Sequence, residues 1–233
     1  MDASIIFSDI LVVPQAMGME CQMVPGKGPN FPNPLTVETL SKLNLTPDVS
    51  KELKYVYDAI TLTRKGLEGK VPLIGFCGAP WTLMAYMIEG GGSKTYSKSK
   101  AWLYKHEKET NLVLDAITDL LIDYLVCQVR AGAQMLQVFE SSAAFLTPQL
   151  FDKYCVHRLK KIATEVKRKL GPDAVPMTVF AKDGHYGIEE LGKSDYDVIG
   201  VDWCTPPEMA RKLANGKVLQ GNLDPCALYA DKV

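Results

Sequence analysis

The chain has 233 residues, of which 47% are hydrophobic and 23% charged, the composition of an ordinary globular protein. Its 26 Lys and Arg balance 27 Asp and Glu, and the net charge of -1 excludes the basic excess of a protein that binds nucleic acid or membrane surfaces. No apolar run reaches the ~18 residues of a membrane span, and the first residues do not show the basic segment followed by an apolar segment that is typical of a signal peptide. We therefore expect a cytoplasmic protein without membrane or nucleic-acid partners.

Six short apolar runs predict the strands of a parallel sheet. Each is almost continuously hydrophobic, as strands covered on both faces are. Amphipathic stretches lie between them, two with clear helical spacing over residues 112–128 and 159–170, the second ended by Gly171 and Pro172. Strand and helix in alternation indicate an α/β fold, either a (β/α)8 TIM barrel or a doubly wound sheet. The runs are residues 4–13, 71–78, 133–140, 175–181, 197–203 and 217–223.

Two glycine-rich segments interrupt this pattern. Residues 24–34 form a Pro/Gly-rich excursion after the first run, long enough for an active-site or interface loop. Gly90, Gly91 and Gly92 follow a helical stretch and predict its end.

Six cysteines occur at wide intervals, without the paired spacing of a zinc site or a disulfide framework. We expect buried, reduced thiols and no bound metal.

The first apolar run contains a carboxylate, Asp9. Burying an unpaired ionised group costs several kcal/mol, so Asp9 must be paired or functional. Two interpretations remain open: Asp9 accepts backbone amides from a neighbouring strand end, or it faces a ligand.

Polar residues also end the later runs, where parallel α/β folds build their sites. They include Glu140 and Ser141 after the third run and Asp202 and Asn222 after the last two.

Lys182 beside Asp183 and His185 is a proton-transfer set or, more commonly, a local loop salt bridge. His106 and His157 lie in helical stretches without a partner at ligand spacing, and we expect them at the surface or at a boundary.

Four motifs in order resemble the uroporphyrinogen decarboxylase family over the whole chain. They are FSDILVVPQAMGM (7–19), GFCGAPWTLMAY (75–86), FAKDG (180–184) and LQGNLDP (219–225). The resemblance implies a (β/α)8 barrel, normally a homodimer, that needs no cofactor. The implied reaction removes the four acetate carboxyl groups of uroporphyrinogen III, the small-molecule substrate, to give coproporphyrinogen III and CO2 in haem biosynthesis.

The same resemblance assigns three site residues. Asp9 matches the catalytic aspartate that accepts the pyrrole N–H groups and stabilises positive charge on the substrate. Tyr86 matches a tyrosine that orients this aspartate and contacts the substrate, and Ser141 matches a serine that binds a substrate carboxylate. Ser142 departs from the histidine that animal members have at that place.

Two parts of the family pattern are missing from these 233 residues. The family's Arg-Gln-Ala-Gly-Arg-Tyr motif and its Gly-His-Gly turn do not occur, and none of the five arginines ends a predicted strand. We therefore expect one barrel domain over residues 1–233, truncated at both ends, with about six parallel strands and without barrel strands one and eight. Such a chain is expected to have little activity alone.

Two other functions are compatible with the same fold. The first is a non-catalytic interaction module, which the missing arginines allow. The second is that of a corrinoid or thiol methyltransferase relative, which needs a zinc-binding His/Cys set that the sequence does not contain.

Overall fold

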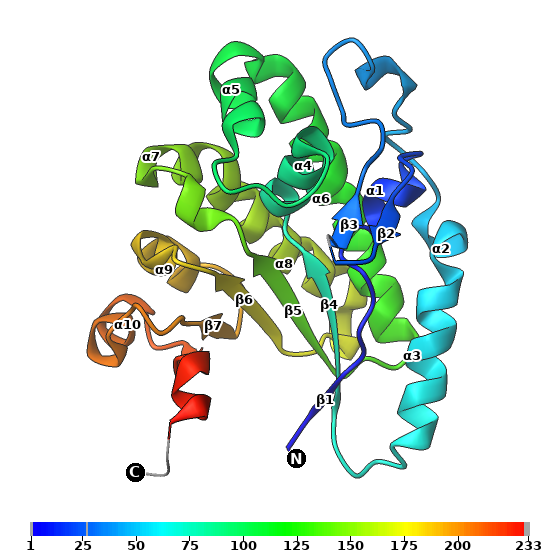
Figure 1. Cartoon of the computed structure of the whole chain (residues 1–233). Helices are drawn as coiled ribbons and strands as arrows, with labels where there is room; N and C mark the ends of the chain where they lie inside the picture. The colour runs from blue at the N-terminus through cyan, green and yellow to red at the C-terminus, as the bar shows by residue number, and fades with distance from the viewer. Residues whose placement is uncertain (1, 27, 231–233) are drawn as a thin grey trace.

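A computed structural model describes residues 2–26 and 28–230. Six strands form one parallel sheet in the order β1-β4-β5-β6-β7-β8, so the chain adds each new strand beside the previous one (Figure 1). The strands are β1 (Ser4–Ile5), β4 (Leu73–Gly78), β5 (Met135–Glu140), β6 (Met177–Ala181), β7 (Val198–Gly200) and β8 (Val218–Gln220).

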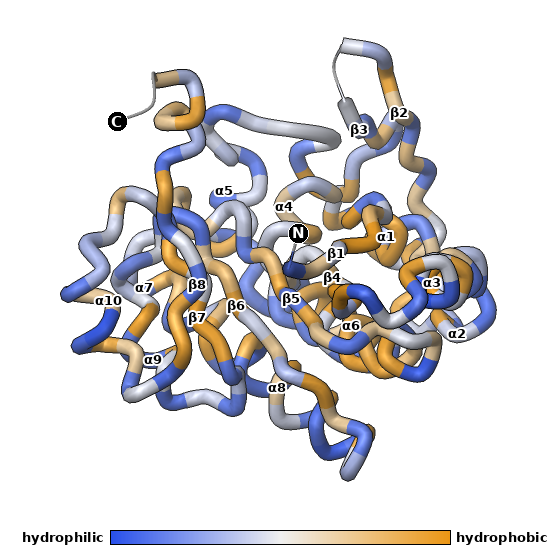
Figure 2. Tube along the Cα trace, turned by 90° about the horizontal axis from the view of Figure 1, so that it is seen from below, coloured by the Kyte–Doolittle hydropathy of each residue, from blue (hydrophilic) through white to orange (hydrophobic). Residues whose placement is uncertain are grey.

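Helices connect the strands and cover one side of the curved sheet (Figure 2). Within the described residues β1 and β8 each pair on one side only, so the sheet is an incomplete (β/α)8 barrel, as predicted. The helices are α1 (Val12–Ala16), α2 (Val49–Glu52), α3 (Lys54–Gly66), α4 (Pro80–Glu89), α5 (Ser97–Lys105), α6 (Glu107–Arg130), α7 (Pro148–Phe151), α8 (His157–Leu170), α9 (Ile188–Gly192) and α10 (Pro207–Leu213).

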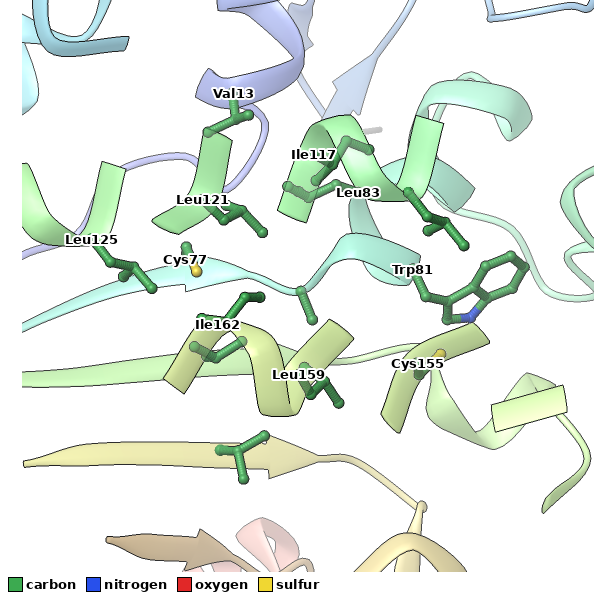
Figure 3. Packing of buried hydrophobic residues seen from close by; sticks show 14 of the residues in the cluster. Val13, Cys77, Trp81, Leu83, Ile117, Leu121, Leu125, Cys155, Leu159 and Ile162 are labelled. Atoms are coloured by element: carbon green, nitrogen blue, oxygen red, sulfur yellow. The ribbon is translucent and has the colours of Figure 1, made fainter. Parts of the chain in front are cut away.

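The core lies between the sheet and helices α4, α6 and α8 (Figure 3). Cys77 of β4, Leu121 of α6 and Ile162 of α8 are all at most 2% exposed and meet in this layer. The sequence explains these helices. The apolar stripe of α8 is buried as predicted, while its lysines form ion pairs with acids on neighbouring elements, such as Lys161 with Asp119 at 2.6 Å.

Two helices also end at the glycines that the sequence predicts as their ends. Gly90 ends α4 with a positive φ of 83°, which glycine adopts at no steric cost, and Gly171 ends α8.

The first predicted strand is wrong over most of its length. Only Ser4–Ile5 pair with β4, and α1 begins at Val12. Asp9 explains the change, because its carboxylate accepts the Leu11 amide at 2.8 Å and turns the chain two residues later.

The side-chain amide of Gln128, on α6, bonds both the amide and the carbonyl of Phe76 at 2.9 Å, so these groups of β4 are satisfied without a strand partner.

Part of the Pro/Gly-rich segment 24–34 pairs as an antiparallel hairpin, in which β2 (Gln22–Val24) runs beside β3 (Gly28–Asn30). The expectation of buried thiols needs correction. The thiols are free, but only Cys77 and Cys155 are buried, while Cys204 and Cys226 are exposed.

None of the helices in the described part of the chain has the length and apolarity needed to span a membrane.

Candidate active site

The three site residues predicted from the sequence lie after three neighbouring parallel strands. Asp9 follows β1, Tyr86 lies on the helix α4 that follows β4, and Ser141 follows β5 directly. Because adjacent parallel strands end at the same edge of a sheet, all three belong to the carboxyl-end rim, where barrel enzymes carry their sites.

Asp9 is half-buried in the loop between β1 and α1. One of its oxygens, Oδ1, accepts the Leu11 amide. The prediction that it accepts amides from a neighbouring strand end is therefore wrong, since the donor lies two residues along the same loop. Asp9 is within electrostatic reach of Cys21, Tyr55 and Tyr86, whose pKa values are raised first by burial and further by its negative charge.

Tyr86 is half-buried on the middle turn of α4. Burial is the main cause of its raised pKa, followed by the charges of Tyr96 and Asp9. A tyrosine with a raised pKa keeps its proton at neutral pH, so the Tyr86 hydroxyl is available as a hydrogen-bond donor. The Asp9 carboxylate and the Tyr86 phenol are thus within electrostatic reach of each other at this rim.

Ser141 is held by a polar chain that the sequence did not predict. Its side chain is exposed at the rim, and its amide donates to Thr82 Oγ1 at 2.9 Å. The Thr82 hydroxyl in turn donates to Glu140 Oε1 at 2.5 Å. Glu140 is fully buried, and burial raises its pKa from 4.5 to about 7, although the Thr82 and nearby amide hydrogen bonds oppose this shift.

Ser142 is 1% exposed and contributes a second contact between β5 and α4. The indole of Trp81 donates to the Ser142 carbonyl at 3.1 Å, and the Ser142 hydroxyl lies 3.2 Å from the Tyr96 hydroxyl. The serine at this position is therefore buried between α4 and the segment that precedes α5.

A row of aromatic rings crosses the inner face of the sheet. Ring centres are 6.3 Å apart between Phe7 and Phe76, 5.7 Å between Phe76 and Phe139, and 6.3 Å between Phe139 and Phe180. These residues come from the segment after β1 and from β4, β5 and β6. The row supplies an apolar surface that suits flat aromatic rings such as pyrroles. The sequence analysis did not predict this aromatic row, although each of three successive apolar runs contains a phenylalanine.

The row leads to a hollow of about 250 Å³ at the ends of β5 to β8, lined by Phe139, Phe180, Trp203 and Asn222 among others. The Lys182 ammonium lies at its edge, 5.6 Å from the centre of the Trp203 ring and 3.6 Å from the Asp183 carboxylate. The local salt bridge predicted for Lys182 and Asp183 is therefore confirmed. His185 contacts the Tyr186 ring instead.

Asp202 ties the ends of β6, β7 and β8 together. Its carboxylate accepts the amides of Asp183 and Cys204 at 2.6 and 3.0 Å, and the Asn222 side chain donates to the Asp202 carbonyl at 3.1 Å. Among the residues described, Asp183, Asp202 and Cys204 are also the one set of three whose ligand atoms lie within 4.8 Å of one another. Both Asp202 oxygens already accept hydrogen bonds, so this cluster is explained by the loop structure.

The described arginines lie away from the site. Arg158 is 2% exposed and bonds Asp115 and Asn111 of α6 at 2.8 Å, so it fastens α8 to α6. Arg64 and Arg130 line a groove near the amino ends of the strands, on the opposite side from Asp9. Lys182 is thus the cation that the structure places at the rim of the aromatic hollow.

Comparison with known proteins gives one family. The model of the family described as uroporphyrinogen decarboxylase (URO-D) matches residues 1–233. Curated uroporphyrinogen decarboxylases of Danio rerio and Homo sapiens are 59% and 56% identical over 99% and 100% of this chain. The chain spans 64% and 65% of the length of these two relatives.

A solved methyltransferase from Methanosarcina mazei superposes with a TM-score of 0.79 over 95% of this chain and 64% of its own, at 19% identity. That likeness shows the barrel-like fold alone. A family model that matches every residue, together with relatives above 50% identity, decides the family: the chain belongs to the uroporphyrinogen decarboxylase family.

Proposed function

We propose that this chain carries the Asp9-centred part of a uroporphyrinogen decarboxylase site, which converts uroporphyrinogen III to coproporphyrinogen III and CO2. One observation carries the proposal: the Asp9 carboxylate lies at the carboxyl-end rim, two residues after Phe7, where the aromatic row from Phe7 to Phe180 begins. An anionic acceptor beside an apolar surface suits a ligand of aromatic rings whose N–H groups point one way.

The chemistry needs an anion that stabilises a transient cation. Protonation of a pyrrole ring gives a cation, and breaking the bond to the acetate carboxyl releases CO2 while its electron pair neutralises the ring. The methylene carbon then takes a proton and the ring loses the one it had gained, so that a methyl group remains. Asp9 accepts the pyrrole N–H bonds and stabilises the cationic stage more than the neutral substrate, which lowers the barrier.

The substrate carboxylates need cationic partners. Lys182 supplies one at the rim, and Ser141 offers a hydroxyl beside it on the next strand end. Since the described arginines lie elsewhere, we infer that the chain alone reacts slowly. A single-turnover assay tests this: with the chain in excess over uroporphyrinogen, coproporphyrinogen is expected to form, at a rate below that of a full-length relative.

Titration with oxidised uroporphyrin gives the second arm of that test. A site centred on Asp9 binds the porphyrin and loses affinity on Asp9→Asn. Binding that ignores this substitution, with no product in the single turnover, overturns the proposal and supports the non-catalytic interaction module instead.

Removing the Tyr86 hydroxyl is expected to weaken the site moderately. Tyr86→Phe keeps the ring and its packing but deletes one hydroxyl donor at the rim, which is worth about 1 kcal/mol, or a loss of roughly fivefold in uroporphyrin affinity. Fluorescence titration measures the loss. Tyr104→Phe, on a tyrosine that is 68% exposed on α5, is the matched control and leaves the affinity unchanged. Equal effects of the two substitutions would remove Tyr86 from the site.

We further propose that residues 1–233 form a single barrel domain, that the protein is cytoplasmic, and that it works as a homodimer in haem synthesis without a cofactor. The family membership supports these statements, and the single continuous core supports the domain. Size-exclusion chromatography with light scattering tests the dimer.

A further inference from the structure

A buried polar chain connects the end of β5 with the start of α4. It runs from the Ser141 amide to Thr82 Oγ1 at 2.9 Å and from the Thr82 hydroxyl to Glu140 Oε1 at 2.5 Å. The Ser142 amide donates to the same Glu140 oxygen at 3.4 Å. Thr82 and Glu140 are both 0% exposed, so water does not compete for these bonds.

The two elements joined by this chain carry two of the three site residues. Ser141 and Glu140 are neighbours at the end of β5, and Tyr86 lies four residues beyond Thr82, one turn along the same face of α4. The Ala79 amide, just before α4, also donates to the Phe139 carbonyl at 2.9 Å. A shift at Thr82 therefore moves the Ser141 backbone and the Tyr86 side chain relative to each other.

We infer that Glu140 is a positioning residue, which uses Thr82 to hold Ser141 and Tyr86 in a fixed relation at the substrate rim. The role in substrate binding rests on the proposed function, whereas the role in fixing the Ser141 amide does not. Hydrogen bonds do not fully compensate the burial of the Glu140 carboxyl group, because its Oε2 atom has no hydrogen-bond partner among the described residues. Buried polar atoms without partners are rare in stable cores and call for a reason.

The surroundings of Glu140 shift it toward the neutral acid, since burial raises its pKa to about 7. The titratable groups that face it are the thiol of Cys155, after α7, and the hydroxyl of Tyr186, before α9. Burial raises the pKa of both, so neither supplies a charge to pair with a carboxylate. A neutral carboxyl still accepts the Thr82 hydrogen bond through Oε1, and so the chain to Ser141 stays intact.

Two substitutions at Thr82 test the role. Thr82→Val keeps the volume but removes the acceptor of the Ser141 amide, and Thr82→Ser restores it. We expect Thr82→Val to speed hydrogen exchange of the Ser141 amide and to weaken uroporphyrin binding, each about tenfold, the effect of one lost buried hydrogen bond. Thr82→Ser is expected to return both to the level of the unsubstituted chain.

Thr118→Val is the matched control, because Thr118 is equally buried but bonds the Leu114 carbonyl within α6 at 2.7 Å. It is expected to lower global stability without a specific change at Ser141. Equal shifts of Ser141 exchange and uroporphyrin affinity in Thr82→Val and Thr118→Val would show a merely structural threonine and overturn the inference.

Glu140 itself is tested by Glu140→Gln and Glu140→Leu. Glutamine keeps the Oε1 acceptor and is expected to protect the Ser141 amide, whereas leucine removes it and is expected to behave like Thr82→Val. A leucine variant with unchanged Ser141 exchange would contradict the inference. If the unsubstituted chain binds no uroporphyrin, the proposed function fails, but Ser141 exchange in these variants still decides whether Glu140 positions the strand end.

Discussion

Asp9→Asn is expected to slow decarboxylation by about 10²- to 10³-fold, the range found when one preorganised electrostatic group is removed from an active site. The side chain keeps its shape but loses the negative charge that stabilises the cationic pyrrole. The fold is expected to stay intact, because asparagine Oδ1 still accepts the Leu11 amide that turns the chain into α1. The single-turnover assay measures the loss.

Asp48→Asn is a close control for Asp9→Asn. Asp48 plays the same local part at the start of α2, where its Oδ1 atom accepts the Ser50 amide at 3.2 Å. Its substitution is expected to leave the rate of decarboxylation unchanged.

A second readout does not need activity. The Asp9 charge contributes to the raised pKa of Tyr55 and of Tyr86, after burial, so Asp9→Asn should lower both phenol pKa values. An unchanged rate in Asp9→Asn, with the phenol pKa values lowered, would show that the charge is present but not used.

Much of the fold could be predicted from the sequence because its central strands are almost continuously hydrophobic. The apolar runs that predict β4, β5 and β6 agree with these strands to within two residues, although β5 alternates between buried and half-buried residues because helices cover only one side of the sheet. The first run failed for a physical reason. After Ile5 the chain has the same apolar composition, but the Asp9 turn and the start of α1 override the preference for a strand.

The site shows a different limit. Asp9, Tyr86 and Ser141 could be named because they sit in recognisable motifs, and strand order then explains why they share one rim. Thr82 could not be found, because in the sequence it is one polar residue in an apolar helix, and its role depends on a contact with Glu140 across 58 residues. The aromatic row likewise depends on the register of Phe139 with Phe180 across two strands.

Glu140 predicts an unusual dependence of stability on pH. Its pKa is about 7 in the folded protein and 4.5 as a free group. Between these values the folded state holds a proton that the unfolded state has lost, so stability falls as the pH rises. The full difference amounts to about 3 kcal/mol of unfolding free energy, present below pH ~4.5 and lost above pH ~7.

Glu140→Gln isolates this effect because the amide stays neutral. The unfolding free energy from urea titrations, measured every half unit from pH 4.5 to 8, is expected to fall for the unsubstituted chain relative to Glu140→Gln. His157, whose pKa is lowered by burial, acts in the opposite direction in the same window, but it is common to both proteins and cancels in the difference.

Glu190→Gln provides the contrasting control. Hydrogen bonds from Lys160 and Lys193 lower the pKa of Glu190 to about 2, so its contribution is present above its unfolded pKa and is lost only as the pH falls toward 2. This substitution is therefore expected to change the acid limb of the stability curve and to leave the slope between pH 4.5 and 7 as it was. Parallel curves for Glu140→Gln and the unsubstituted chain would mean that Glu140 is ionised in the core, and the neutral acid that we infer beside Thr82 and Ser141 would have to be abandoned.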